Sequence, residues 1–200
     1  KHARALIEAG LDKIIYSFDA HDKDLYEKLR VGAKYDEVVE NILRFQRIRN
    51  EMGRMFPVTR VSMVRMKDNL HDVENFVEFW KDKVDLVSLV DYQNPLGHDK
   101  TDRTSSEVED TFFACSQLWQ RLFIWWDGSV HLCCGDYEGE INLGNVNDMT
   151  VEEVWTGQRL SKIRELHQTG QFRRIKLCDR CNVNRMKPGS GMFVKGQEYK

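Results

Sequence analysis

The fold is decided by a series of apolar strands, the first of which reads KIIYSF at residues 13–18. Two similar stretches follow, PVTRVSMVRM at residues 57–66 and VDLVSLV at residues 84–90. Each is rich in β-branched residues and nearly continuous in hydrophobicity, which is typical of buried strands in a parallel sheet. Amphipathic patterns predict helices before and between them, at residues 2–9, 22–30, 35–52 and 69–80. This alternation predicts an α/β fold whose three units correspond to half of a (β/α) barrel.

Polar side chains lie at the expected carboxyl ends of these strands. In α/β sheets, ligands bind at this edge. This places Ser17, Asp19, Arg65 and Asp91 on the candidate active face. Ser17 and Asp19 could bind a sugar hydroxyl or a carboxylate, or Asp19 could simply cap the next helix, and the residues alone favour neither. Arg30 could bind a carboxylate through two hydrogen bonds, although an exposed arginine at a helix end is the simpler interpretation.

Two helix starts carry capping signals in this first half. Asp22 is expected to cap the helix at residues 22–30, and Asn69 the helix at residues 69–80, because short polar side chains accept hydrogen bonds from free backbone N–H groups.

The pattern changes in the second half of the chain. Residues 98–110 are polar and read as a linker or exposed loop. Residues 122–126 and 130–133 flank Asp127-Gly128, a strong hairpin signal. Thr150 and Glu153 form a capping box, and a second amphipathic helix follows up to Gly170. We therefore predict domains at residues 1–110 and 111–185, with a tail at residues 186–200.

Four of the five cysteines can converge on one metal centre. Cys115 and Cys133 frame the hairpin, while Cys178 and Cys181 form a C-x-x-C pair. Four thiolates select zinc or iron–sulfur over hard cations, and their spacing does not decide between the two. Cys134 would point to the opposite strand face and is not expected to bind the metal. The alternative, unrelated buried thiols, is less consistent with this spacing.

The sequence indicates structural roles for most histidines and for the tryptophans of the second half. His21, His71, His98 and His131 show no ligand spacing and are expected to be solvated or structural. The tryptophans at 119, 125 and 126 are expected to belong to the core of the small domain rather than to a stacking surface.

Composition narrows the class of protein. Acidic and basic residues are interleaved and the formal net charge is −2, so no nucleic-acid or membrane partner is indicated. No apolar run is long enough to span a membrane, and the few, odd-numbered cysteines favour a reducing cytoplasmic setting. The absence of an initiator methionine and of an opening strand suggests a fragment.

The first half resembles the middle of a radical S-adenosylmethionine barrel. The resemblance rests on residues 15–19 (IYSFD) and 26–30 (YEKLR), and it continues through residues 31–42. Ala20 replaces the glycine usual in that family. The family's C-x3-C-x2-C triad is absent from this sequence, so the fragment alone is not expected to cleave S-adenosylmethionine. The resemblance implies that Ser17 and Arg30 contact the methionine moiety and that Asp19 belongs to the cofactor's environment.

The second half is similar to the SPASM/twitch extension of that superfamily. The pattern C-x(9–15)-G-x4-C is met by Cys115, Gly128 and Cys133, and residues 143–145 and 153–155 also recur there. Full SPASM domains have further cysteines after the C-x-x-C pair, and this sequence has none. The resemblance therefore implies a small α+β domain with one auxiliary [4Fe–4S] cluster, held by Cys115, Cys133, Cys178 and Cys181.

The implied function is that of a radical enzyme. S-adenosylmethionine and a second [4Fe–4S] cluster in the full-length protein would generate a 5′-deoxyadenosyl radical that abstracts a hydrogen atom from a small molecule or peptide. The auxiliary cluster would assist oxidation, and a flavodoxin or ferredoxin would donate electrons. Two alternatives remain: a non-catalytic four-cysteine zinc or iron–sulfur module for partner recognition, and, with less support, a redox-active C-x-x-C protein.

Overall fold

The computed structural model describes residues 2–93, 114–181 and 192–195. These residues fall into two compact units, one built from residues 2–92 with 192–195 and the other from residue 93 with residues 114–181. The predicted linker at residues 98–110, with His98, lies outside the described residues.

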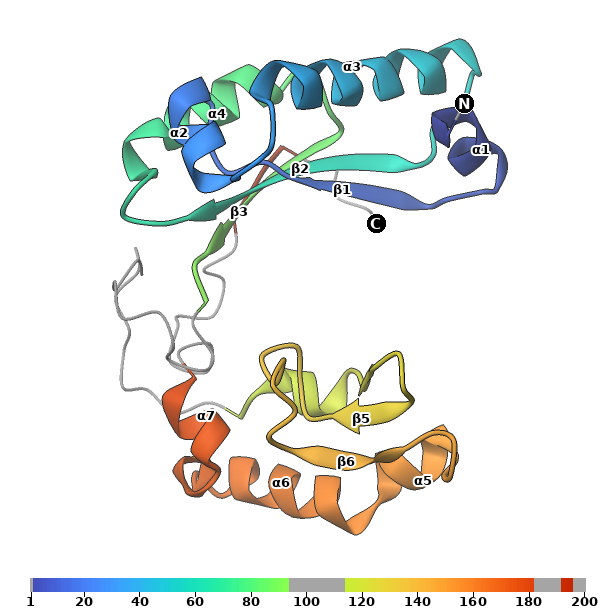
Figure 1. The fold of residues 1–200 in the computed structure, drawn as a ribbon, viewed down its shortest axis with the longest axis vertical. Helices are drawn as coiled ribbons and strands as arrows, with labels where there is room; N and C mark the ends of the chain where they lie inside the picture. The colour runs from blue at the N-terminus through green and yellow to red at the C-terminus, as the bar shows by residue number, and fades with distance from the viewer. Residues whose placement is uncertain (1, 94–113, 182–191, 196–200) are drawn as a thin grey trace. The chain divides into compact units, whose positions relative to one another are not determined.

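The first unit alternates strands and helices in the predicted order, which confirms the α/β class. Strands β1, β2 and β3 pair in parallel as neighbours, and helices α2, α3 and α4 lie on one side of the sheet (Figure 1). The elements of this unit are α1 (His2–Glu8), β1 (Lys13–Ser17), α2 (Lys23–Leu29), α3 (Tyr35–Glu51), β2 (Val58–Arg65), the 3₁₀ turn η1 (Leu70–Asp72), α4 (Val73–Trp80), β3 (Leu86–Asp91) and β7 (Met192–Lys195).

The helix-covered face of the sheet carries the core of the first unit. Met63 of β2, Leu89 of β3 and Phe18, which directly follows β1, pack with Phe76 and Trp80 and are almost completely buried. The opposite face of β1 carries Lys13, Ile15 and Ser17, which are exposed. The sequence therefore predicted more burial for β1 than the structure shows, because β1 is an edge strand of this sheet.

The predicted tail at residues 186–200 requires a correction. Met192–Lys195 forms strand β7, which pairs antiparallel with β3 and completes the sheet order β1-β2-β3-β7. The physical reason is that β3 would otherwise present a row of unpaired backbone N–H and C=O groups along its edge, and an extended segment satisfies them.

One of the two predicted caps is confirmed and the other is wrong. Asp22 accepts a hydrogen bond from the backbone N–H of Leu25 at 2.8 Å and caps α2. Asn69 makes no capping bond to the helix that follows. Its side chain instead donates to the carbonyl oxygens of Asp19 (2.7 Å) and Val64 (2.9 Å), because these buried carbonyls have a stronger need for a donor than a solvent-facing helix end.

The second unit packs helices against a three-stranded antiparallel sheet. The sheet order is β4-β5-β6, and residues from its strands pack with α5, α6 and α7 (Figure 1). The predicted capping box is present, with Thr150 and Glu153 each bonded to the other's backbone N–H. The elements of this unit are η2 (Ser116–Trp119), β4 (Phe123–Ile124), β5 (Ser129–His131), β6 (Asn142–Asn145), α5 (Val151–Thr156), α6 (Gln158–Gln168), η3 (Phe172–Arg174) and α7 (Lys176–Arg180).

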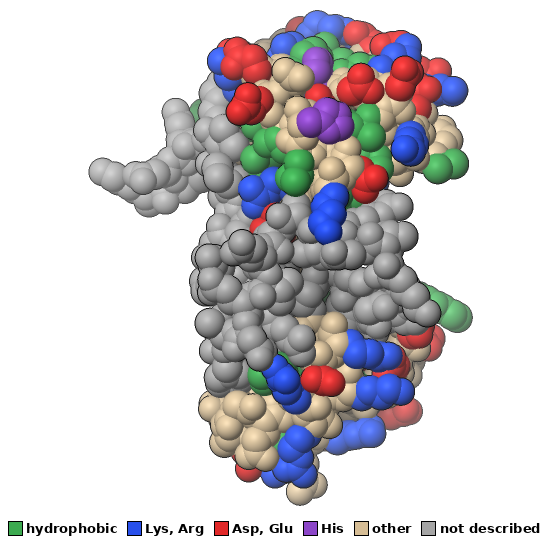
Figure 2. Space-filling model, turned by 90° about the vertical axis from the view of Figure 1, so that its left-hand side faces the viewer, with side chains coloured by type: hydrophobic (Ala, Val, Ile, Leu, Met, Phe, Trp, Pro, Cys, Tyr) green, Lys and Arg blue, Asp and Glu red, His purple; other side chains and the backbone are tan. Residues whose placement is uncertain are grey.

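The surface of the described residues mixes charges of both signs. Figure 2 shows lysine and arginine side chains interspersed with aspartate and glutamate on the face in view, without a large field of either sign. Among the described helices, none has the length and hydrophobicity needed to cross a membrane.

Candidate metal centre

Four cysteines from three separate segments line one small pocket in the second unit. Cys115 precedes η2, Cys133 follows β5, Cys178 lies in α7, and Cys181 directly follows α7. The pocket has a volume of about 30 Å³, and its remaining lining is formed by Leu118, Leu132, His167 and Leu177. The structure therefore brings together all four residues that the sequence proposes as metal ligands.

Burial favours the protonated form of the Cys115, Cys133 and Cys178 thiols when no metal is bound. It raises the pKa of the Cys133 thiol to about 12, and it also raises the pKa values of Cys115 and Cys178. Charge on the neighbouring sulfurs adds to the effect, so the four thiols cannot ionise together without a compensating cation. A soft metal ion or cluster supplies that cation and displaces the protons.

The donor set fits a thiolate-bound metal group. Four sulfurs with apolar neighbours match zinc or iron–sulfur, and the described lining of the pocket offers none of the carboxylate ligands that hard cations require. Within the described ranges, no group of three or more His, Cys, Asp or Glu side chains is already arranged to hold a metal ion. The four cysteines thus meet as the lining of one pocket rather than as a closed ligand shell.

His167 is the one polar residue in this described lining besides the cysteines, and the sequence interpretation missed it. It is 1% exposed, and its Nε2 lies 3.4 Å from the Sγ of Cys178. Burial lowers the pKa of His167 to about 4. The available signal was periodicity, since residue 167 continues the apolar stripe of Leu160 and Ile163 along α6.

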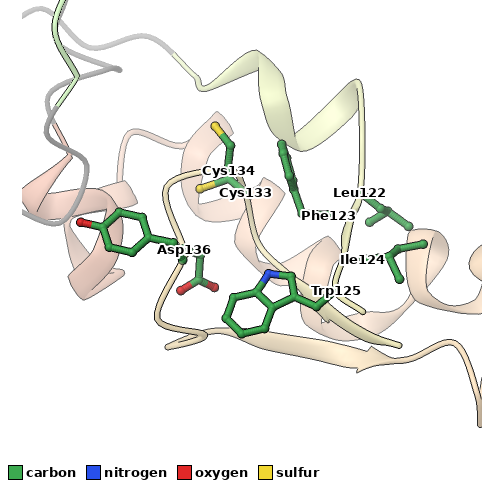
Figure 3. A pocket seen from close by; sticks show the side chains of 8 residues that line it. Leu122, Phe123, Ile124, Trp125, Cys133, Cys134 and Asp136 are labelled. Carbon is green, nitrogen blue, oxygen red and sulfur yellow. The ribbon is translucent and has the colours of Figure 1, made fainter. Parts of the chain in front are cut away.

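A wider and more open pocket, of about 470 Å³, lies beside the cysteine pocket (Figure 3). Cys133 lines both pockets, while the exposed Cys134 lines only the wider one. Its wall also includes the aromatic rings of Phe123, Trp125 and Tyr137. A molecule held there would lie against a residue of the metal centre.

The tryptophans of the hairpin correct one sequence expectation. Trp125 is half-buried, packs on the buried His131 at 3.9 Å between ring centroids and lies outside the core cluster of this unit, and Trp119 is exposed. Trp126 is 96% exposed and is not part of the core, because it directly precedes the Asp127-Gly128 turn at the hairpin tip.

The first unit holds the other predicted site residues at the carboxyl end of β1. Arg30 forms an ion pair with Asp19 at 2.5 Å, and the other carboxylate oxygen of Asp19 accepts the N–H of Val64 at 2.9 Å. Ser17, the last residue of β1, is exposed on the face away from the helices. Asp19 is 6% exposed and already committed to protein partners, so it is placed to orient Arg30.

Two further serines align with Ser17, which the sequence interpretation did not notice. Ser17 is the register partner of Ser62, and Ser62 is the register partner of Ser88. The three therefore share one level and one face of the sheet. Arg65 and Asp91, also predicted at the active face, pair with one another at 2.6 Å where β2 and β3 end.

Comparison with known proteins defines the class of the second unit. Residues 115–182 match the SPASM family, an iron-sulfur cluster-binding domain. This range begins at Cys115 and includes all four cysteines of the pocket, so the metal group of this class is an iron–sulfur cluster.

Two sequence relatives each match more than half of this chain. The chain is 30% identical over 121 residues to a GTP 3',8-cyclase of Listeria welshimeri, and the match covers 59% of this chain and 34% of that protein. It is 27% identical over 121 residues to an uncharacterized protein of Treponema pallidum, covering 59% of this chain and 32% of the relative. The matched stretch is thus about a third of the length of these relatives.

A solved structure described as "Native anSMEcpe with bound AdoMet" shares the fold. Its TM-score is 0.57 at 14% identity, with 94% of this chain and 64% of that chain covered. Together, the matches support the resemblance of this chain to radical S-adenosylmethionine proteins with a SPASM domain.

Proposed function

We propose that this chain is part of a radical S-adenosylmethionine enzyme in which the second unit holds one auxiliary [4Fe–4S] cluster. The observation that carries the proposal is the convergence of Cys115, Cys133, Cys178 and Cys181 on one pocket within the SPASM match. When bound and reduced by a second cluster, S-adenosylmethionine supplies a 5′-deoxyadenosyl radical for hydrogen abstraction. The sequence of this chain does not contain the C-x3-C-x2-C motif that would hold that second cluster.

In the first unit, Ser17 and Arg30 are proposed to bind the methionine moiety. The Nε–H of Arg30 is buried and has no hydrogen-bond partner among the described residues, so it can donate to a carboxylate. Asp19 holds the Arg30 guanidinium in place through their ion pair. The hydroxyl of Ser17 is exposed at the end of β1, on the sheet face away from the helices, and is proposed to supply a further hydrogen bond.

In the second unit, the wider pocket is proposed to receive part of a small-molecule or peptide substrate. Phe123 and Trp125 offer apolar ring surfaces, and Asp136 is a buried carboxylate in the same wall (Figure 3). Since Cys133 lines this pocket as well as the cysteine pocket, a substrate there would be close enough to exchange an electron with the cluster. This arrangement supports an oxidation in preference to a group transfer.

The partners follow from the same chemistry. A flavodoxin or ferredoxin would supply electrons, and the protein would work in the cytoplasm, where free thiols remain reduced. No disulfide joins any of the five cysteines, all of which belong to the described residues.

The test is metal analysis of the anaerobically purified protein, extended upstream to include the complete barrel. We expect about eight irons per chain with matching sulfide, as two [4Fe–4S] clusters require. Cys178→Ser is expected to reduce this to about four, with loss of one electron paramagnetic resonance signal. Cys134→Ser is the matched control, because Cys134 is adjacent to a ligand but is exposed outside the cysteine pocket, and it is expected to retain full iron content.

Two outcomes would overturn the proposal. Stoichiometric zinc without iron in the parent protein would favour a structural four-cysteine module for partner recognition. Equal loss of iron from Cys134→Ser and Cys178→Ser would show that the pocket does not define the ligand set.

A further inference from the structure

The buried ring of His167 lies between two of the proposed cluster ligands. Its Nδ1 is 3.4 Å from the backbone nitrogen of Cys115, and its Nε2 is 3.4 Å from the Sγ of Cys178. The ring also packs on Phe172, with 5.8 Å between centroids, and only 1% of the residue is exposed. These contacts fix both the position and the plane of the imidazole.

The two hydrogen bonds also determine which nitrogen carries the proton. The backbone N–H of Cys115 can only donate, so Nδ1 must accept. A neutral imidazole with an accepting Nδ1 has its proton on Nε2. The Nε2–H therefore points at the sulfur of Cys178 and is its donor.

We infer that His167 is a positioning residue that donates Nε2–H to the Cys178 sulfur and raises the reduction potential of the auxiliary cluster. The inference rests on the proposed function, because it requires a cluster bound at Cys178. A hydrogen bond to a ligand sulfur stabilises negative charge, and the reduced cluster carries one more electron than the oxidised one. The bond thus favours the reduced state, which suits a cluster that accepts an electron from a substrate.

The position of His167 strengthens the effect. The rest of the described pocket wall is apolar apart from the cysteines, with Leu118, Leu132 and Leu177 around it, so little solvent competes for the sulfur. Among the side chains that line this pocket in the described residues, His167 alone carries an N–H donor. Its removal would leave the Cys178 sulfur without this bond.

The first experiment is a redox titration of the 200-residue chain reconstituted anaerobically with iron and sulfide. His167→Phe keeps an aromatic ring but removes the donor, and we expect the ratio of reduced to oxidised cluster at fixed potential to fall about tenfold, or about 59 mV for one electron. His167→Gln restores an N–H donor and is expected to recover most of that shift. His131→Phe is the matched control, since His131 is also buried in this unit but does not line the cysteine pocket, and it should leave the potential unchanged.

A second measurement uses the unmodified chain, so that a folding defect in a variant cannot obscure the result. With histidine labelled by ¹⁵N, electron–nuclear double resonance of the reduced cluster is expected to show one coupled ¹⁵N and one exchangeable proton. A bound cluster with no such coupling, or an unchanged potential in iron-replete His167→Phe, would overturn the inference. Zinc in place of iron would instead overturn the proposed function, so the two failures are distinguishable.

Discussion

Replacing Asp19 separates its structural role from its role in orienting Arg30. The carboxylate accepts the partly buried N–H of Val64 at 2.9 Å and pairs with Arg30 at 2.5 Å. Removing the acceptor of a buried N–H costs about 1–3 kcal/mol. The ion pair adds at most about 1 kcal/mol, because 38% of the Arg30 side chain is exposed to screening solvent.

We therefore expect Asp19→Ala to lower the free energy of unfolding by about 2–3 kcal/mol. Asp19→Asn should cost only about 1 kcal/mol or less, because its amide oxygen can still accept from Val64. Both variants lose the charge that holds Arg30, so both should bind S-adenosylmethionine about tenfold more weakly, which corresponds to about 1.4 kcal/mol.

Urea denaturation followed by circular dichroism measures the stability difference, and equilibrium dialysis of the complete protein against labelled S-adenosylmethionine measures the affinity. If Asp19→Asn were as unstable as Asp19→Ala, the bond to Val64 would not be the stabilising contact. If Asp19→Asn bound the cofactor normally, Arg30 would not depend on Asp19 for its orientation.

Three further substitutions test stability. Arg49→Met should cost about 2–3 kcal/mol in denaturant titrations, because it leaves the half-buried Asp85 without its ion-pair partner. Burial raises the pKa of Asp85, but hydrogen bonds from Arg49 and Thr59 outweigh burial and lower the pKa below the ordinary 3.8. The parent protein should therefore lose stability as the pH falls below about 4, and Arg49→Met should lose less stability over the same range. Gly128→Ala should lower the melting temperature and the iron content, because φ is +83° and a Cβ would collide with Asn147. Trp126→Ser, at an exposed hairpin tip, should change stability by no more than about 0.5 kcal/mol in the same assay.

The parts of the fold that depend on local sequence could be predicted. The strands at Val58–Arg65 and Leu86–Asp91 follow from short stretches rich in apolar and β-branched residues, and the α5 start follows from the Thr150–Glu153 capping box. The pairing of β7 with β3 could not be predicted, since it joins segments about a hundred residues apart and depends on an edge that exists only in the folded sheet.

The candidate metal centre could also be predicted only in part. The spacing of the cysteines predicted that four thiols meet at one site, because residue type and separation along the chain are themselves what indicates a metal site. The contact between His167 and Cys178 was not predictable from pattern, because a histidine on an apolar helix stripe is more often a packed core residue. The role of Asn69 was misjudged for a related reason: it was read as a helix cap, whereas its side chain donates to backbone carbonyls in the fold.

Cys133 gives the strongest structural argument for how the proposed cluster would take part in the reaction. This residue lines both the narrow cysteine pocket and the wide aromatic pocket, so a molecule in the wide pocket would lie against a proposed cluster ligand. A cluster held only to stabilise the fold would not need a second, open pocket against one of its ligands. Under our proposal, removal of a ring from the wider pocket by Trp125→Ala would therefore weaken substrate binding while leaving the iron content unchanged, since Trp125 lines only that pocket. Loss of iron together with substrate affinity would show instead that Trp125 supports the hairpin on which Cys133 depends.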